Sequence, residues 1–277
     1  MRILLTNDDG IHAEGLEALE RIARTLSDDV WVCAPEVEQS GASRALTLSD
    51  PLRIRKLEPR RFAVSGTPTD CVLLAVQDLL EDRRPDLVLS GVNRGQNLAE
   101  DVSFSGTVAG ALAGMMLGVP AIALSQALTR FHDDEQAMFD TAEAFAPDII
   151  RQLIGTGWPE DVVINVNFPD VAAEAVTGVE VTRQGSREVA LMHATRRTDL
   201  RGRDYYWMGF RGNPGTPPVG TDLRAVYDGR VSITPLHVDL THTDTVARLR
   251  ETFGAPAPAP AAASPRLEEA PEGRADG

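Results

Sequence analysis

The stretch DLVLSGVNRGQNLAEDVSFSGTVAGALAGMMLGVPAIALS (86–125) contains two short apolar runs, separated by a loop and a segment of small residues. The first run, DLVLSG (86–91), ends at a glycine. The second run, PAIALS (120–125), starts at Pro120, two residues after Gly118. A glycine and a proline this close together end a helix. Short apolar runs bounded by turn residues are typical of strands buried on both faces. The stretch therefore predicts a strand, a loop, a helix and a parallel second strand.

The same alternation extends over about the first 170 residues. Apolar residues recur at helical spacing after the first predicted strand, and a second helical stripe runs from Met138 to Leu153. Strands that alternate with helices predict an α/β fold, here a Rossmann-like, mostly parallel sheet with helices on both faces. The predicted strands are Arg2–Thr6, 30–35, 62–66, 86–91, 120–125 and 162–169.

The pattern changes from about Val179, where β-rich segments follow one another without helical spacers. We expect a catalytic core over 1–178 and a β-containing extension or arm over 179–254, with a role in oligomerisation. The Pro/Ala-rich and then charged segment 255–277 predicts a disordered tail. Within the core, alternating apolar and polar residues over 45–57 predict a hairpin arm.

The charge balance argues against a polymeric nucleic acid partner. The 277 residues carry 41 acidic and 27 basic side chains, for a formal net charge of -14. Cys33 and Cys71 lie far apart without a metal-ligand motif, which is typical of free thiols in a reducing compartment. The uncharged segment 102–129 is long enough for a membrane span, but Gly118–Pro120 divides it. We therefore expect a soluble cytoplasmic protein without a membrane partner.

Two adjacent carboxylates, Asp8 and Asp9, follow the first predicted strand, and open α/β sheets bind ligands at the carboxyl ends of their strands. Carboxylates about 4 Å apart repel each other by roughly 4 kcal/mol at an effective dielectric of about 20. One pKa then rises, or a cation binds between them. A divalent ion such as Mg²⁺ suits such oxygen ligands, and Ser40 and Asn93 are able to complete its shell. The sequence Asn-Asp-Asp-Gly also favours a turn. The aspartate pair alone therefore does not show whether this segment binds a cation or only forms a turn.

An independent pattern predicts a phosphate site. Residues 105–107 begin a helix of small residues, where free backbone N–H groups and the helix dipole favour an anion. Capping and turn formation explain each of these residues equally well when it is taken alone. No dinucleotide fingerprint follows the first strand, so a metal-dependent phosphate site is the more coherent interpretation. The candidate phosphate-binding residues are Asn97, Ser105, Gly106 and Thr107.

Five segments occur together in one order: MRILLTNDDGIHAEGL (1–16), APEVEQSGASRALTL (34–48), VSGTPTDCV (64–72), DLVLSGVNRGQNLAEDVSFSGTVAGA (86–111) and GRVSITPLHVDLT (229–241). Together they resemble SurE, the survival protein family of metal-dependent 5′/3′-nucleotidases. The resemblance extends from residue 1 to about residue 243. Glu14 stands where the family commonly has proline, and Arg44 where it often has a small amide or histidine. Neither position is a presumed metal ligand.

The resemblance implies hydrolysis of nucleoside 5′- and 3′-monophosphates, and in some members of short polyphosphate, with one divalent ion, Mg²⁺ or Mn²⁺. It also implies a homodimer or homotetramer built by exchange of C-terminal elements. Asp8 and Asp9 become the candidate catalytic residues, with Asp8 as an ion ligand, a general base or a covalent nucleophile. The implied metal ligands are Asp8, Asp9, Ser40 and Asn93, and the implied phosphate-binding residues are Asn97, Ser105, Gly106 and Thr107.

Two other functions are weighed against this one. An aspartyl-phosphate phosphatase of the haloacid dehalogenase type needs Asp-x-Asp after its first strand and a downstream lysine. The sequence has Asp8-Asp9 and a single lysine, Lys56, in the predicted hairpin region. A nucleotide-binding regulator that has kept the pocket without turnover is the second alternative, and an activity assay separates it from an enzyme.

Overall fold

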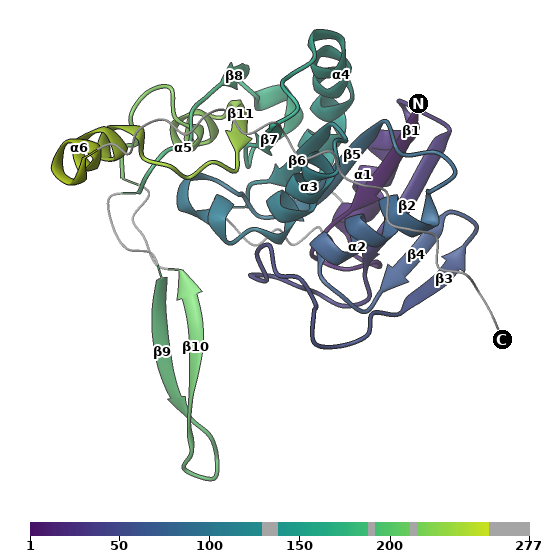
Figure 1. Ribbon diagram of the computed structural model, residues 1–277, viewed down its shortest axis with the longest axis horizontal. Coiled ribbons are helices and arrows are strands. Elements are labelled where there is room, and N and C mark those ends of the chain that lie inside the picture. Colours follow the sequence, from purple (N-terminus) through teal and green to yellow (C-terminus); the bar gives the residue numbers. More distant parts are fainter. Residues whose placement is uncertain (129–137, 188–191, 211–214, 255–277) are drawn as a thin grey trace. The chain divides into compact units, whose positions relative to one another are not determined.

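The computed structural model describes residues 1–128, 138–187, 192–210 and 215–254. Within these residues the main feature is a nine-stranded sheet, and β9 and β10 form a separate two-stranded sheet (Figure 1). The strands are β1 (Arg2–Thr6), β2 (Asp29–Pro35), β3 (Ile54–Glu58), β4 (Arg61–Val64), β5 (Leu87–Arg94), β6 (Ala121–Gln126), β7 (Val162–Phe168), β8 (Val179–Val181), β9 (Met192–Thr198), β10 (Asp204–Phe210) and β11 (Val231–His237). The α-helices are α1 (Glu14–Arg24), α2 (Pro68–Leu74), α3 (Gly106–Met116), α4 (Asp140–Thr156), α5 (Asp222–Tyr227) and α6 (Thr243–Phe253).

The nine strands lie in the order β3-β4-β2-β1-β5-β6-β7-β11-β8. The strands from β4 to β7 in this order are parallel to their neighbours, whereas β3 and β11 run antiparallel to β4 and β7. β1 lies inside the sheet, where Leu5 is opposite Val32 of β2 and Leu89 of β5. The predicted α/β fold with a mostly parallel sheet is confirmed.

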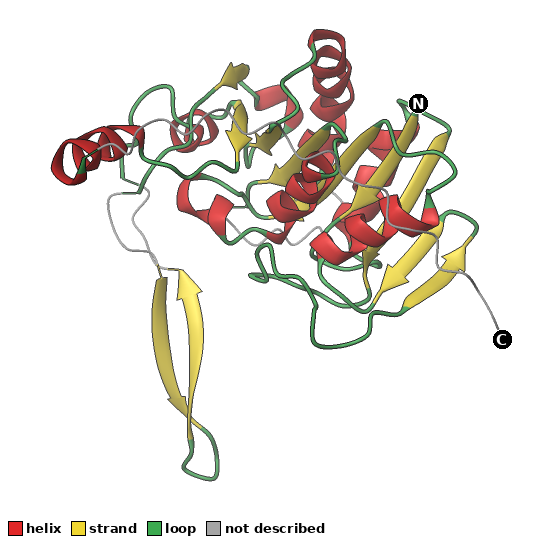
Figure 2. Cartoon of the chain, in the orientation of Figure 1, coloured by secondary structure: helices red, strands yellow, loops and turns green. Residues whose placement is uncertain are grey.

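Helices cover both faces of the sheet (Figure 2). Ile3 and Leu5 of β1 belong to the apolar cluster that includes residues of α1 and α4, and Leu4 belongs to the cluster that includes residues of α2 and α3. Successive side chains of a strand point to opposite faces. Both faces of β1 are therefore buried, which explains why its apolar residues run without alternation.

The predicted hairpin over residues 45–57 is wrong. Residues 45–53 form no strand, and β3 pairs antiparallel with β4 instead. Thr47 donates its backbone N–H and its hydroxyl to Asp70, at 3.2 and 2.7 Å, and the N–H of Arg53 donates to Ser65 Oγ at 2.9 Å. Polar groups that a hairpin would have paired are thus bonded to other segments.

Two strands of the predicted β-rich extension belong to the main sheet, because β11 pairs with β7 and β8 pairs with β11. The chain divides into two compact units, Met1–Val238 and Asp239–Gly277, and α6 lies in the second. The domain boundaries at 178 and 254 remain predictions, and the predicted disordered tail, 255–277, lies outside the described residues.

The two cysteines are free and buried, as predicted, and Cys33 Sγ donates a hydrogen bond to the backbone oxygen of Cys71 at 3.3 Å. No helix among the described residues has the length and apolar character that crossing a membrane requires.

Candidate active site

The candidate site lies where β1 ends beside β5, with Thr6 paired to Ser90. From β1 the chain continues to β2 and β4 on one side of the sheet, whereas β5, β6 and β7 follow on the other side. Open α/β sheets bind ligands in the crevice at such a reversal of strand order. Asp8 and Asp9 follow β1 at this edge, and Asn93 is near the end of β5.

Asp8 is buried and held by the start of α3. It is 5% exposed, and its Oδ1 accepts a hydrogen bond from Thr107 Oγ1 at 2.5 Å. Burial raises the pKa of this carboxyl above its ordinary value. The Thr107 hydroxyl and the backbone N–H groups of Thr107 and Gly106 oppose that rise without cancelling it. Asp8 is therefore a carboxyl group with one fixed orientation.

Gly106 allows α3 to approach Asp8 closely. A Cβ atom at Gly106 would lie 2.7 Å from both Cβ and Oδ2 of Asp8, a separation that side chains do not tolerate. Ser105 caps the helix, because its Oγ accepts the N–H of Val108 at 3.0 Å. Ser105 thus has a capping contact and Thr107 a contact with Asp8, and a phosphate role for residues 105–107 remains a prediction.

Asp9 contacts the end of β5, where its Oδ2 accepts the backbone N–H of Arg94 at 3.3 Å. Burial, followed by the negative charge of Asp8, raises the pKa of Asp9 to about 7. Glu38 contributes a smaller rise in the same direction. Two carboxylates that oppose each other's ionisation form an arrangement that a bound cation stabilises.

Ser40 is linked to Asp8 through the residue before it in the chain, Gln39. The backbone N–H of Gln39 donates to the backbone oxygen of Asp8 at 2.7 Å. The side chain of Ser40 is exposed and donates to Glu38 Oε1 at 2.7 Å. The segment of Ser40 is thus next to β1, as the predicted metal site requires, and its role as a ligand remains a prediction.

Asn93 is linked to Asp9 through the residue after it in the chain, because the backbone N–H of Arg94 donates to Asp9 Oδ2. Asn93 Nδ2 donates to the backbone oxygen of Gly95 at 2.8 Å. The other terminal atom of the amide, Oδ1, is of the type that binds a hard cation. Asn93 as a metal ligand remains a prediction.

The four predicted metal ligands offer carboxylate, hydroxyl and amide oxygen atoms. This donor set fits Mg²⁺ or Mn²⁺, which accept oxygen ligands and keep bound water. In the part of the chain that the structure describes, no cluster of three or more His, Cys, Asp and Glu side chains is arranged to hold a metal. A site of two carboxylates with Ser40 and Asn93 agrees with that result, because only the two aspartates belong to those residue types.

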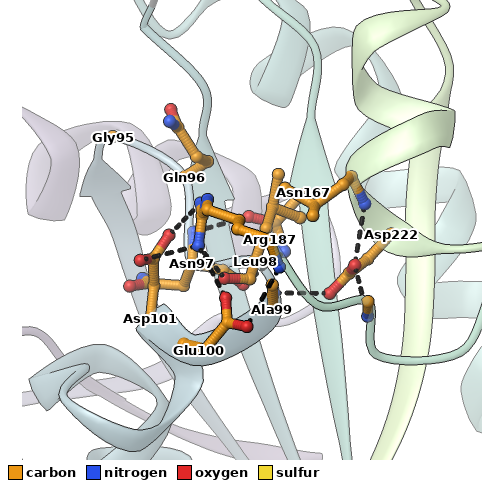
Figure 3. Close-up of polar contacts among 12 residues, drawn as sticks. Gly95, Gln96, Asn97, Leu98, Ala99, Glu100, Asp101, Asn167, Arg187 and Asp222 are labelled. Carbon is orange, nitrogen blue, oxygen red and sulfur yellow. Dashed lines mark hydrogen bonds and ion pairs between the residues drawn. The ribbon is translucent and has the colours of Figure 1, made fainter. Parts of the chain in front are cut away.

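Asn97 is held in a buried network of amides. Its N–H donates to Asn167 Oδ1 at 2.8 Å, and its backbone oxygen accepts from Asn165 Nδ2 at 2.9 Å (Figure 3 shows Asn97 and Asn167). Its own Nδ2 donates to Ser125 Oγ at 2.8 Å. An amide nitrogen carries two hydrogens, so one further donor remains for an anion. The phosphate role of Asn97 remains a prediction.

A polar network at Asn165 and Asn167 was predictable from the sequence. They are two amides in the otherwise apolar strand VVINVNF (162–168), and both are fully buried. Buried amides need hydrogen-bond partners, so a pair of them in a strand indicates a polar network at that point.

Asp222 and Arg187 were not identified from the sequence. Asp222 Oδ2 accepts the N–H of Ala99 at 2.8 Å, and Arg187 Nη2 pairs with Asp101 Oδ2 at 2.6 Å (Figure 3). These partners are 123 and 86 positions apart in the chain. No local pattern signals contacts of that length.

The comparison with protein families gives a match that covers most of the chain. The family model described as "Survival protein SurE" matches residues 3–190. This chain belongs to the SurE family. The match includes every predicted site residue, from Asp8 to Thr107, whereas Asp222 lies beyond it.

Relatives in the SurE family are similar over nearly their whole length. The 5′-nucleotidase SurE of Caulobacter vibrioides (strain NA1000 / CB15N) is 67% identical over 258 residues, which are 93% of this chain and 98% of the relative. That of Phenylobacterium zucineum (strain HLK1) is 64% identical over 93% of this chain and 99% of its own length. The crystal structure of the SurE protein from Aquifex aeolicus has a TM-score of 0.78 and 39% identity, and the match covers 91% of this chain and all of that one.

Proposed function

We propose that this chain is a metal-dependent phosphomonoesterase that hydrolyses nucleoside 5′-monophosphates to nucleosides and phosphate. The observation that carries the proposal is the contact of Asp8 with the start of α3, which places a carboxylate pair and a helix N-terminus at one sheet edge. The relatives named 5′-nucleotidase SurE support a nucleotide as the substrate.

One divalent ion, Mg²⁺ or Mn²⁺, would be held by Asp8, Asp9, Ser40 and Asn93. The donor atoms are all oxygens, and burial together with the charge of Asp8 raises the pKa of Asp9, which supports a bound cation. When bound, such an ion neutralises phosphate charge and polarises a phosphoryl oxygen.

The residues of the chain supply position and hydrogen bonds. Thr107 holds Asp8 in one orientation, so the carboxylate does not need to reorganise when substrate enters. The amide of Asn97 would provide a donor for phosphate oxygens, and the dipole at the start of α3 would favour an anion beside Asp8, to which the N–H groups of Gly106 and Thr107 donate. Phosphate monoesters hydrolyse extremely slowly without a catalyst, so most of the barrier reduction has to come from such positioning and charge neutralisation.

We also propose activity on nucleoside 3′-monophosphates and short polyphosphate. The candidate residues would surround the terminal phosphoryl group, which these substrates share with 5′-monophosphates. A site that binds mainly this group discriminates weakly between what is attached to it.

The proposed assembly is a homodimer or homotetramer in the cytoplasm. β10 exposes Tyr206, Trp207 and Met208, which are 60, 66 and 71% exposed and belong to residue types enriched at protein interfaces. Free thiols at Cys33 and Cys71 support a reducing compartment. Light scattering after size exclusion measures the number of subunits.

The decisive experiment is phosphate release from 5′- and 3′-nucleoside monophosphates and tripolyphosphate with Mg²⁺, Mn²⁺ or EDTA. We expect release with a metal ion and none in EDTA. Asp8→Asn should abolish release with the fold intact, and Asp78→Asn, at an exposed aspartate, is the matched control. Absence of release with either metal, from folded protein, would overturn the proposal in favour of a nucleotide-binding regulator.

A further inference from the structure

Asp222, the first residue of α5, joins three segments of the chain. It is 0% exposed, and its Oδ2 accepts the N–H of Ala99 at 2.8 Å. Its Oδ1 accepts the N–H groups of Gly185 at 2.8 Å and of Leu223 at 2.7 Å. Hydrogen bonds to a carboxylate are roughly twice as strong as those between neutral groups. The carboxylate therefore ties the loop after β5 to α5 and to the segment around residue 185.

Ala99 is the residue of the loop after β5 that Asp222 contacts. It has a φ of 51°, in the left-handed region that residues with a Cβ atom rarely adopt. Asp222 holds its N–H, and Gln184 Nε2 donates to its backbone oxygen at 2.8 Å. Ala99 also packs in a small apolar cluster with Leu98 and Leu223. The unfavourable conformation of Ala99 is thus held by hydrogen bonds at both of its backbone polar groups.

Arg187 holds the residues on either side of Ala99. Its Nη1 donates to the backbone oxygen of Leu98 at 3.1 Å, and its Nη2 pairs with Asp101 Oδ2 at 2.6 Å (Figure 3). Its side chain is 12% exposed. Arg187 Nη1 also donates to Asp101 Oδ1 at 3.0 Å, and a partly buried bidentate pair of this kind restrains both partners more than a surface ion pair does.

The restrained segment leads directly into the candidate active site. The backbone oxygen of Asp101 accepts the N–H groups of Phe104 and Ser105, both at 2.9 Å. Ser105 caps α3, and Thr107 of its first turn donates to Asp8. A continuous series of contacts therefore connects Asp222 with Asp8.

We propose that Asp222 is a positioning residue for the active site. It holds Ala99 in the left-handed conformation, which fixes segment 99–105 and sets the start of α3 against Asp8. Asp222 touches neither Asp8 nor the phosphate position, so it acts through the loop and not on the reacting atoms. Its catalytic effect rests on the proposed function, whereas its effect on the loop does not.

The test uses Asp222→Asn in the full chain. The asparagine amide has one accepting oxygen where the carboxylate has two. If this oxygen keeps the bonds from the N–H groups of Gly185 and Leu223, the N–H of Ala99 loses its acceptor. We expect kcat to fall by between about ten- and a hundredfold, with KM changed by less than about threefold, because the reacting groups are misplaced. Asp228→Asn, at the exposed carboxylate after α5, is the matched control and should leave kcat unchanged.

A rescue experiment separates positioning from general destabilisation. Glycine adopts positive φ without a Cβ penalty, so Ala99→Gly should restore most of the kcat of Asp222→Asn. Ala99→Gly alone should leave kcat near that of the wild type. Failure of the rescue, or an unchanged kcat in folded Asp222→Asn, would overturn the proposal. If Asp222→Asn does not fold, Gln184→Met removes the other bond to Ala99 at an exposed side chain and should lower kcat in the same way.

Hydrogen exchange gives a readout that does not depend on activity. The amides of Phe104 and Ser105 should exchange faster in Asp222→Asn than in the wild type, and Ala99→Gly should reverse the change. Unchanged exchange overturns the role of Asp222 in the loop even if the wild type is active. If the wild type releases no phosphate, the proposed function fails, and faster exchange still establishes the hold on the loop.

Discussion

Thr107 Oγ1 donates a hydrogen bond to Asp8 Oδ1 at 2.5 Å, and the two residues are 99 positions apart in the chain. This contact joins the loop after β1 to the first turn of α3. It turns two separate sequence patterns, an acidic pair and a helix start rich in small residues, into one site. The orientation of Asp8 is therefore set by a residue that the sequence suggested only as a phosphate ligand.

Thr107→Val should lower kcat/KM by about ten- to a hundredfold, because a hydrogen bond to a charged group is worth about 1.5–3 kcal/mol. Thr107→Ser keeps the hydroxyl and should stay within about threefold of the wild type. Steady-state kinetics on both variants checks this prediction. Equal activities of the valine and serine variants would show that the hydroxyl does not position Asp8.

Gly106→Ala should lower kcat strongly without unfolding the protein. The added Cβ would lie 2.7 Å from two atoms of Asp8, whereas alanine favours the helix itself by about 1 kcal/mol over glycine. Gly155→Ala in α4 is the control, since no atom lies within 4 Å of its added Cβ. Kinetics and thermal unfolding are measured on both. Wild-type kcat in Gly106→Ala would mean that α3 yields to the new atom without disturbing Asp8.

The raised pKa of Asp9 predicts a pH dependence of stability in EDTA. A carboxyl whose pKa is raised to about 7 by folding does not change stability below its unfolded pKa of 3.8, where it is protonated in both states. As pH rises from about 4 to about 7, the group increasingly destabilises the metal-free fold, and above about pH 7 the penalty is complete.

Asp9→Asn removes this titration, so the variant should gain stability over the wild type between pH 5 and pH 8, on the order of 2 kcal/mol. Urea unfolding in EDTA at both pH values measures the difference. With Mg²⁺ or Mn²⁺ present at pH 8, the wild type should recover. A stability difference that stays constant with pH contradicts the prediction.

Asp70→Ala should lower the free energy of unfolding by about 2–4 kcal/mol. Asp70 completes the capping box of α2 with Thr67 and accepts two hydrogen bonds from Thr47, so its loss removes contacts in two segments. Urea unfolding measures the effect, and Asp78→Ala, at an exposed aspartate nearby in the chain, should stay within about 0.5 kcal/mol. If the two variants lose equal stability, Asp70 does not have this role.

The strands of the core were readable from the sequence because burial on both faces demands an uninterrupted apolar run, as in β1 and β6. The hairpin predicted over 45–57 was wrong in the segment 45–53, where the pattern was also read locally. Its alternation is typical of a half-buried strand, but Thr47 and Arg53 bond to Asp70 and Ser65 instead of to a partner strand. A local pattern does not show which distant groups compete for the backbone.

By itself the sequence determined the family, through the five segments that resemble SurE. It also determined the α/β class and the edge at which Asp8 and Asp9 lie, because apolar periodicity and a strand end are local properties. Only the tertiary structure decided which groups those residues contact. Thr107 reaches Asp8, and Asp222 reaches Ala99, across 99 and 123 positions of the chain. Such contacts follow from how helices pack on the sheet, since packing alone brings distant donors within hydrogen-bond reach of a buried carboxylate.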